Sequence, residues 1–208
     1  MSKIKIIGII AAAAVIIIIA VFAVILMTGS SGNDENIINK EMFIPKNSVK
    51  WQKTETTGEI RAIFRTEKGD FELKLAECEA AEKFIELAKA DVFDEADFPV
   101  LAENLFIQTG ICGETFSVSE NKMACIRGAV GFVNDDGETY PGLVIITAED
   151  ISAELEGKVT VFGQIISGME NVDDIAFSEN TGYTGGFSAI ESIAIKDIEI
   201  IYPLNPEN

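Results

Sequence analysis

Short apolar runs, each ended by glycine, asparagine or aspartate, constrain the fold of this chain more than any other feature. The first pair lies in residues 58–77, GEIRAIFRTEKGDFELKLAE, where apolar and polar residues alternate on both sides of EKGD. Alternation with a period of two places the apolar side chains on one face of each strand. The segment therefore predicts a β-hairpin whose turn includes Gly69.

The rest of the chain adds further strands and two short helices. Residues 78–91, CEAAEKFIELAKAD, place Phe84, Leu87 and Ala88 at helical spacing, and a second helix is expected at about 169–175. Runs of strand length make up most of the remainder: NLFIQTG, GAVGFVN, GLVIITAED, VTVFGQII and IESIAIKDIEII. Short strands separated by turn residues predict a mainly β fold, a barrel or a sandwich with helical caps.

The N-terminal segment predicts a membrane anchor. Ile6 to Met27 contains no charged residue, and a helix of that length spans a bilayer core of about 30 Å. It is longer than the apolar region of a signal peptide and lacks a clear cleavage site, so an uncleaved anchor is favoured over a cleaved signal. Lys3 and Lys5 precede the span, which predicts a cytoplasmic N-terminus.

These features divide the chain into parts. We expect a cytoplasmic stub and transmembrane signal anchor at 1–28, a linker at 29–54, a folded domain at 55–204 and a tail at 205–208. The expected location is the cell membrane, with a single pass and an extracytoplasmic C-terminal domain. The chain carries 34 acidic against 16 basic residues, which argues against nucleic acid and anionic lipid as partners of that domain.

Residues that commonly hold metals are scarce. The chain has no histidine, and Cys78, Cys112 and Cys125 lack zinc-type spacing. The acidic segment NDDGE lacks the ligand spacing of an EF-hand and is interpreted as a turn. We therefore expect no metal and no cofactor. The cysteines are interpreted as reduced thiols, and a bridge between Cys112 and Cys125 stays open. The glycine-rich segment TGYTGGFS, 181–188, is interpreted as a flexible connection.

Five segments, in order, resemble the cyclophilin family of peptidyl-prolyl isomerases over about residues 59–202. TEKGDFELKL resembles the family's T-x-K-G-D-I-x-I-x-L, and KFIELAKADVFD its N-F-x-x-L-A-x-x-G-Y-Y-D. FIQTG resembles M-I-Q-G-G, RGAVGFVN resembles R-G-x-x-S-M-A-N, and LEGKVTVFGQIISGMENVDDI resembles the block that begins L-D-G-K-H-x-V-F-G. The resemblance implies a closed eight-stranded antiparallel barrel capped by two short helices, here with one N-terminal transmembrane helix.

The resemblance also implies a chemistry, rotation about an X-Pro amide, whose barrier is about 18–20 kcal/mol. An arginine donates a hydrogen bond to the prolyl nitrogen, and no metal or nucleophile is needed. In this sequence Gln108 and Asn134 match the family's glutamine and asparagine. Leu105 and Phe106 occupy the apolar positions before that glutamine, and Leu155 matches the leucine before the D-G-K turn.

Other positions depart from the family pattern. The family's F-H-R-V is FPVL here, so Val100 stands at the arginine position, and Val159 stands at the pocket histidine. In YPGLVII, Leu143 or Val144 replaces the pocket phenylalanine and Gly142 its glutamine. Valine cannot donate a hydrogen bond, and such a donor is worth about 3 kcal/mol. We therefore predict no catalytic residue, and substrate binding by Leu105, Phe106, Gln108, Asn134, Val144 and Leu155.

The preferred function is a membrane-anchored extracytoplasmic domain that binds proline-containing or extended polypeptide segments, with weak or no isomerase activity. The first alternative is an active peptidyl-prolyl cis-trans isomerase that assists the folding of exported proteins. A second alternative is a scaffold whose binding site is filled by its own side chains. An isomerase assay and peptide titration separate the three.

Overall fold

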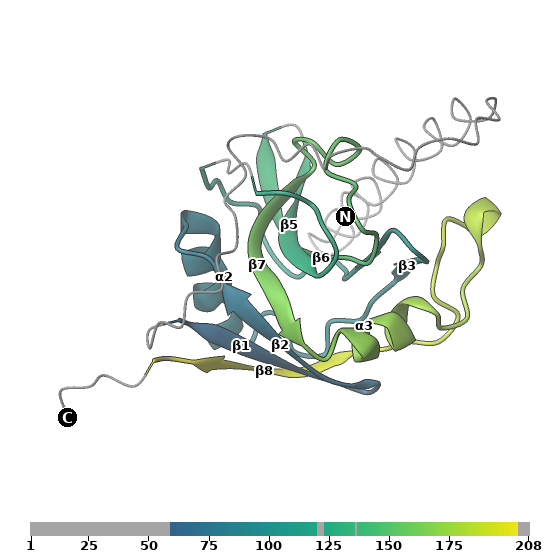
Figure 1. Ribbon diagram of the computed structural model, residues 1–208, viewed down its shortest axis with the longest axis horizontal. Helices are drawn as coiled ribbons and strands as arrows, with labels where there is room; N and C mark the ends of the chain where they lie inside the picture. The colour runs from purple at the N-terminus through teal and green to yellow at the C-terminus, as the bar shows by residue number, and fades with distance from the viewer. Residues whose placement is uncertain (1–58, 120–122, 136, 204–208) are drawn as a thin grey trace, which may run out of the picture.

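The computed structural model describes residues 59–119, 123–135 and 137–203 (Figure 1). The predicted anchor, linker and tail at 1–28, 29–54 and 205–208 lie outside these residues, so they stay predictions. Within the described part of the chain, no helix is both long enough and apolar enough to cross a membrane.

One antiparallel sheet of eight strands forms the domain, as the sequence predicted. Its order is β3-β4-β6-β5-β7-β2-β1-β8, and it curls around the interior (Figure 1). The strand bounds are β1 Arg61–Thr66, β2 Gly69–Leu75, β3 Val100–Ala102, β4 Phe106–Gln108, β5 Ala129–Asp135, β6 Glu138–Ile146, β7 Val159–Ser167 and β8 Ile195–Ile201.

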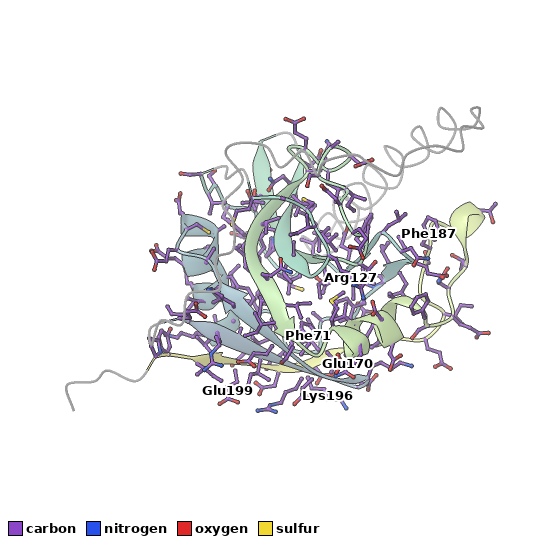
Figure 2. All side chains as sticks on the ribbon, viewed as in Figure 1. Phe71, Arg127, Glu170, Phe187, Lys196 and Glu199 are labelled. Carbon is purple, nitrogen blue, oxygen red and sulfur yellow. The ribbon has the colours of Figure 1, made fainter. Side chains whose placement is uncertain are left out.

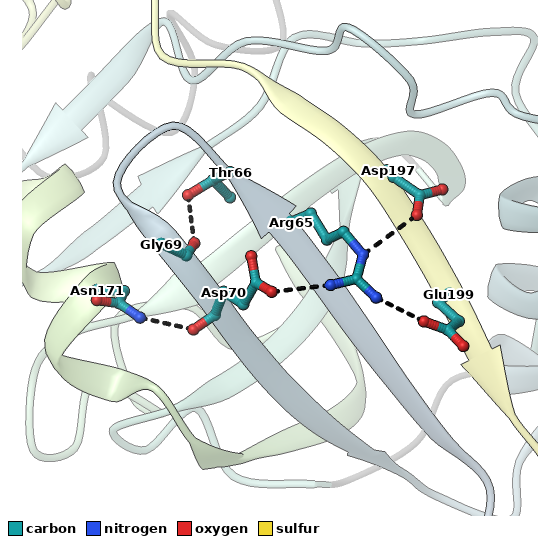
Figure 3. Close-up of polar contacts among 7 residues, drawn as sticks. All are labelled: Arg65, Thr66, Gly69, Asp70, Asn171, Asp197 and Glu199. Atoms are coloured by element: carbon teal, nitrogen blue, oxygen red, sulfur yellow. Dashed lines mark hydrogen bonds and ion pairs between the residues drawn. The ribbon is translucent and has the colours of Figure 1, made fainter.

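The predicted first hairpin is confirmed. β1 and β2 pair from Arg61↔Lys74 to Thr66↔Gly69, and the Thr66 hydroxyl donates to the Gly69 carbonyl at 2.6 Å. Gly69 has φ of +120°, a conformation that favours glycine. A Cβ there would lie 2.7 Å from the Asn171 side chain, so the turn also needs glycine for space. Asn171 donates in turn to the Asp70 carbonyl at 2.6 Å (Figure 3).

The predicted closed barrel is only partly realised. β3 and β8 are the two ends of the strand order and share no regular ladder. Between them, Asp97 and Ala194 form an isolated bridge, and the Phe98 amide donates to the Ile193 carbonyl at 3.0 Å. The sheet is therefore a curled half-barrel whose edges are joined through irregular segments.

The two predicted helices lie where the sequence placed them. α2 spans Glu79–Lys89 and buries Phe84 and its alanines against the sheet, while α3 spans Met169–Ala176. A one-turn 3₁₀ helix, η1 at Tyr183–Gly185, follows. α2 packs near β7 and β8, and the two helices lie towards opposite sides of the domain in Figure 1.

Aromatic rings fill the interior of the curled sheet. Phe84 of α2 stacks on Phe162 of β7 at 4.7 Å between ring centroids, and on Phe64 of β1 at 5.8 Å. Phe162 also contacts Phe132 of β5 at 4.6 Å. All four rings are fully buried, so a single aromatic core joins the helix to three strands.

Candidate functional site

A second apolar cluster covers the other face of the sheet. In β4, Ile107 points into the aromatic core, while Phe106 belongs to the second cluster. The same alternation operates in β6, where Leu143 and Ile145 face the core and Val144 faces the second cluster. The site is therefore built on the outer face of strands whose inner face makes the core.

Cross-strand partners form one continuous row on this outer face. Val100 of β3 pairs with Gln108 of β4, and Gln108 pairs with Val144 of β6. Val144 pairs with Gly131 of β5, which pairs with Val161 of β7. We call this row, together with Phe106 and Leu155, the candidate face.

Glycine is required at the β5 position of the row. A Cβ on Gly131 would lie 2.5 Å from the Val159 side chain and 2.7 Å from the Thr160 carbonyl oxygen. β5 and β7 therefore approach too closely here for any side chain. The sequence contained this glycine in GAVGFVN but no signal for its role.

The Gln108 carboxamide is the exceptional polar group of the candidate face. The side chain is 1% exposed, and among the described residues neither its Oε1 nor its Nε2 has a hydrogen-bond partner. An unpaired buried polar group of this kind costs about 1–3 kcal/mol. Its neighbours in the row, Val100 and Val144, offer no donor or acceptor on their side chains. The amide is therefore available to a ligand that reaches this face.

A tight turn brings Leu155 to the candidate face. The Lys158 amide donates to the Leu155 carbonyl at 2.9 Å, and Gly157 adopts φ of +70°. Leu155 is 2% exposed and belongs to the second cluster. The LEGK motif thus acts through its geometry, because the glycine permits the turn that folds the leucine inward.

Asn134 lies apart from the other predicted binding residues. Val133 belongs to the second cluster, so alternation turns Asn134 to the opposite side of β5. Its Nδ2 donates to the Thr160 hydroxyl of β7 at 2.6 Å, while its Oδ1 is buried without a partner among the described residues. The asparagine therefore links two strands.

The other predicted binding residues lie on or beside the candidate face. Phe106, Gln108, Val144 and Leu155 lie on the candidate face, and Leu105 packs against the same cluster. The choice between Leu143 and Val144 is decided by alternation in favour of Val144. Sequence reasoning missed several members of this cluster: Tyr140, which lies in β6, and three residues from loops, Cys125, Ile151 and Phe187.

All three arginines of the chain have acidic or carbonyl partners away from the candidate face. Arg65 contacts Asp70 at 2.9 Å and Glu199 at 2.7 Å on the exposed side of β1, β2 and β8 (Figure 3). Arg61 pairs with Glu72 at 2.8 Å.

Arg127 is the arginine closest in sequence to the candidate face. It donates to the Thr147 carbonyl at 2.7 Å and to Asp173 of α3 at 2.5 Å, and Figure 2 labels it near that helix. Its guanidinium therefore clamps α3 to the end of β6.

Two cysteines, one in each apolar cluster, are held as neutral thiols. Burial and, to a smaller extent, Asp150 raise the pKa of Cys125 to about 12. Burial and then Asp97 raise the pKa of Cys112 to about 11. None of the three cysteines forms a disulfide bond among the described residues. Because the thiolate is the nucleophile, neither Cys112 nor Cys125 suits nucleophilic catalysis.

Comparison with known proteins shows which family this chain matches. The model of the family "Cyclophilin type peptidyl-prolyl cis-trans isomerase/CLD" matches residues 61–200. A Cryptosporidium parvum cyclophilin type peptidyl-prolyl cis-trans isomerase matches with a TM-score of 0.60 at 20% identity, covering 71% of this chain and 99% of that one.

A crystal structure of the same C. parvum protein in the presence of dipeptide Ala-Pro gives a TM-score of 0.57 at 20% identity, covering 68% of this chain and 98% of that one. At this identity the likeness speaks for the fold alone. No curated protein sequence matches the chain. Since the family model spans most of the folded domain, the chain belongs to the cyclophilin-type peptidyl-prolyl cis-trans isomerase family.

Proposed function

We propose that the candidate face binds proline-containing or extended polypeptide segments, and that the domain has weak or no isomerase activity. The unpaired carboxamide of Gln108, buried between Val100 and Val144 of an apolar row, carries this proposal. Nε2 can donate to a peptide carbonyl, and Oε1 can accept from the N–H of a residue other than proline, while a proline ring suits the surrounding valines and Phe106. A similar fold has been crystallised in the presence of dipeptide Ala-Pro.

The expectation of weak catalysis rests on Val100. This residue pairs with Gln108 across β3 and β4, next to the amide that would hold the substrate. Rotation of the prolyl bond is helped by a donor to the prolyl nitrogen, and losing such a donor typically costs about 10²–10³-fold in rate. Valine has no donor, and the three arginines have the partners described above.

Binding at this face requires movement of neighbouring side chains. Val100, Phe106 and Val144 are at most 2% exposed, and Ile111, Met123 and Phe187 pack against their cluster. A peptide must therefore displace some of these contacts. If it cannot, the face is filled by the protein itself and the scaffold alternative holds.

Peptide titration tests the binding proposal. The full chain, labelled with ¹⁵N in detergent micelles, is titrated with a tetrapeptide that contains Ala-Pro, and with the same peptide in which alanine replaces proline. We expect the Gln108 side-chain amide signals to move with the proline peptide, and movement with both peptides would show that extended segments bind without proline. Unchanged Gln108 signals at millimolar peptide would refute the proposal.

A protease-coupled isomerase assay of the same micelles tests the expectation of weak catalysis. We expect a rate near that of micelles alone. The double change Pro99→His with Val100→Arg restores both a backbone N–H and a donor, and should raise the rate if the face opens. Val100→Met is the control, because it adds length without a donor. Turnover by the unmodified chain at rates typical of an efficient isomerase would instead support the active-enzyme alternative.

We also propose that Ile6–Met27 anchors the chain in the cell membrane with the domain outside. The uncharged run and the two preceding lysines support this orientation. With the native cysteines replaced by alanine, a thiol introduced by Ser31→Cys should react with an impermeant reagent on intact cells. Reaction only after lysis would reverse the orientation.

A further inference from the structure

We propose that the hairpin 178–190 forms one wall of the peptide site, with Phe187 and Ser188 contacting the residue next to the bound proline. This inference rests on the proposed function and extends it to specificity. The glycine-rich part of this segment suggested a flexible connection, yet the structure pairs it with the edge of the sheet. Figure 1 shows the hairpin projecting beyond β3 and α3.

The hairpin pairs with the edge of β3 that faces away from β4. The Leu101 amide donates to the Phe187 carbonyl at 2.9 Å, and the Ala189 amide donates to the Pro99 carbonyl at 3.0 Å. These two bonds flank the bridge between Val100 and Ser188. Residues in such a non-hydrogen-bonded antiparallel pair have Cα atoms about 4.5 Å apart and side chains on the same face.

The row of the candidate face is thereby extended by one strand. Ser188 lies beside Val100, and Val100 lies beside Gln108. The Ser188 hydroxyl is thus the nearest side-chain donor in the row on the far side of the valine. Ser188 is exposed and donates to the Gly185 carbonyl at 3.1 Å, a bond that a peptide carbonyl can replace.

Phe187 reaches the same face through an unusual backbone conformation. Its φ of +55° lies in the left-handed region, which is costly for a bulky residue. In a regular strand Phe187 and its neighbour Ser188 would point to opposite faces. The left-handed conformation breaks this alternation, so the Phe187 ring packs against the second apolar cluster, on the same face as Ser188. Figure 2 labels Phe187 in the hairpin.

Hydrogen bonds hold the hairpin in this arrangement. The Phe187 amide donates to the Gly182 carbonyl at 2.9 Å, and the Thr181 amide donates to the Ser188 carbonyl at 2.9 Å. The Ser188 amide donates to the Thr181 hydroxyl at 3.0 Å. The wall is therefore ordered before any ligand arrives, which lowers the entropic cost of binding.

The side chains of the wall predict which residue next to the proline is bound best. An aromatic ring beside an apolar row favours an apolar side chain next to the proline, and the Ser188 hydroxyl donates to a backbone carbonyl whatever that side chain is. We expect the native chain to bind a Leu-Pro tetrapeptide about tenfold more tightly than the matching Ala-Pro peptide, a difference of about 1.4 kcal/mol.

Variants of the two residues test the wall. Phe187→Asn removes the ring but tolerates the left-handed conformation, and Ser188→Ala removes the hydroxyl. The controls are Phe177→Asn and Ser167→Ala. Phe177 is 59% exposed at the end of α3, and Ser167, at the end of β7, donates to the Glu72 carboxylate at 3.5 Å. Both control residues lie outside the row.

The measurement is the dissociation constant of each peptide for the full chain in micelles, from the Gln108 amide shifts. Phe187→Asn should abolish the tenfold preference for the Leu-Pro peptide. Ser188→Ala should raise the dissociation constants of both peptides about threefold, as expected for the loss of one hydrogen bond. The controls should match the native chain. Should Phe187→Asn fail to fold, Phe187→Gly accepts the same φ without strain and replaces it.

The outcomes separate the two proposals. Native binding with Gln108 shifts, but with unchanged preference and affinity in both wall variants, would overturn the wall and leave the proposed function standing. Absence of any Gln108 shift in the native chain would overturn both.

Discussion

The two faces of the curled sheet are packed in different ways. Inside, Phe84 stacks on Phe64, Phe93 and Phe162 with ring centroids 4.7–5.9 Å apart. Outside, the candidate face is made mainly of valines around one buried amide. Gln108 there is 1% exposed with both polar atoms unpaired among the described residues.

This difference indicates which face of the sheet tolerates substitutions. The aromatic interior joins helix and strands through large contact areas, so loss of a ring affects the whole fold. The outer face places valines, Phe106 and Leu155 over a backbone that the inner face already positions. Its unpaired amide lowers stability, and natural proteins retain such costs mainly where a ligand or function compensates.

The largest expected loss of stability comes from a substitution in the aromatic interior. Phe84→Ala should lower the free energy of unfolding by about 3–5 kcal/mol, because it removes a ring that contacts three others. Val144→Ala on the candidate face should cost only about 2 kcal/mol, since it removes two methyl groups. Chemical denaturation of the full chain in micelles, followed by near-UV circular dichroism, measures both. Equal losses would mean that the two clusters form one core.

The second prediction sharpens the contrast at Gln108. Gln108→Met keeps the shape and removes the unpaired amide, so it should stabilise the fold by about 1–2 kcal/mol while abolishing peptide binding. Gln164→Met is the matched control, because Gln164 Nε2 donates to the Arg127 carbonyl at 2.7 Å and its loss should destabilise. Destabilisation by Gln108→Met would show that the amide has a structural partner.

A smaller effect is expected where Arg127 joins α3 to the sheet. Arg127→Met should cost about 1–2 kcal/mol, because charge-assisted bonds to Thr147 and Asp173 are lost from a half-buried position. Arg61→Met should cost at most about 1 kcal/mol, since the Arg61 side chain is 44% exposed and its contact is a single pair with Glu72. Thermal unfolding of both variants gives the comparison. A larger loss in Arg61→Met would contradict this ranking.

The smallest effect concerns pH. The pKa of Cys125 is raised to about 12 in the fold, so above the unfolded thiol's pKa of about 8.5 only the unfolded state loses the proton. The contribution of Cys125 to stability is therefore full below that pH and falls by about 1 kcal/mol between pH 8.5 and 9.5. Urea unfolding at the two pH values should show a drop that Cys125→Ala reduces. An unchanged drop in this variant would assign it to other groups.

Local sequence pattern by itself determined much of this protein. The period-two runs around Gly69 encode the β1–β2 hairpin, and the helical spacing of Phe84, Leu87 and Ala88 encodes α2. These features depend on neighbours within one element, where side-chain direction follows directly from backbone period. The same logic, with the family resemblance, gathered Phe106 and Gln108 into one site.

The tertiary structure alone decided how separate strands meet. Alternation in β5 and β6 placed Val144 on the candidate face and turned Asn134 to the opposite side, a choice that depends on register between strands. The pairing of Ser188 with Val100 joins residues 88 positions apart. No local pattern encodes such a contact, because it forms only when the curled sheet brings the hairpin to the edge of β3.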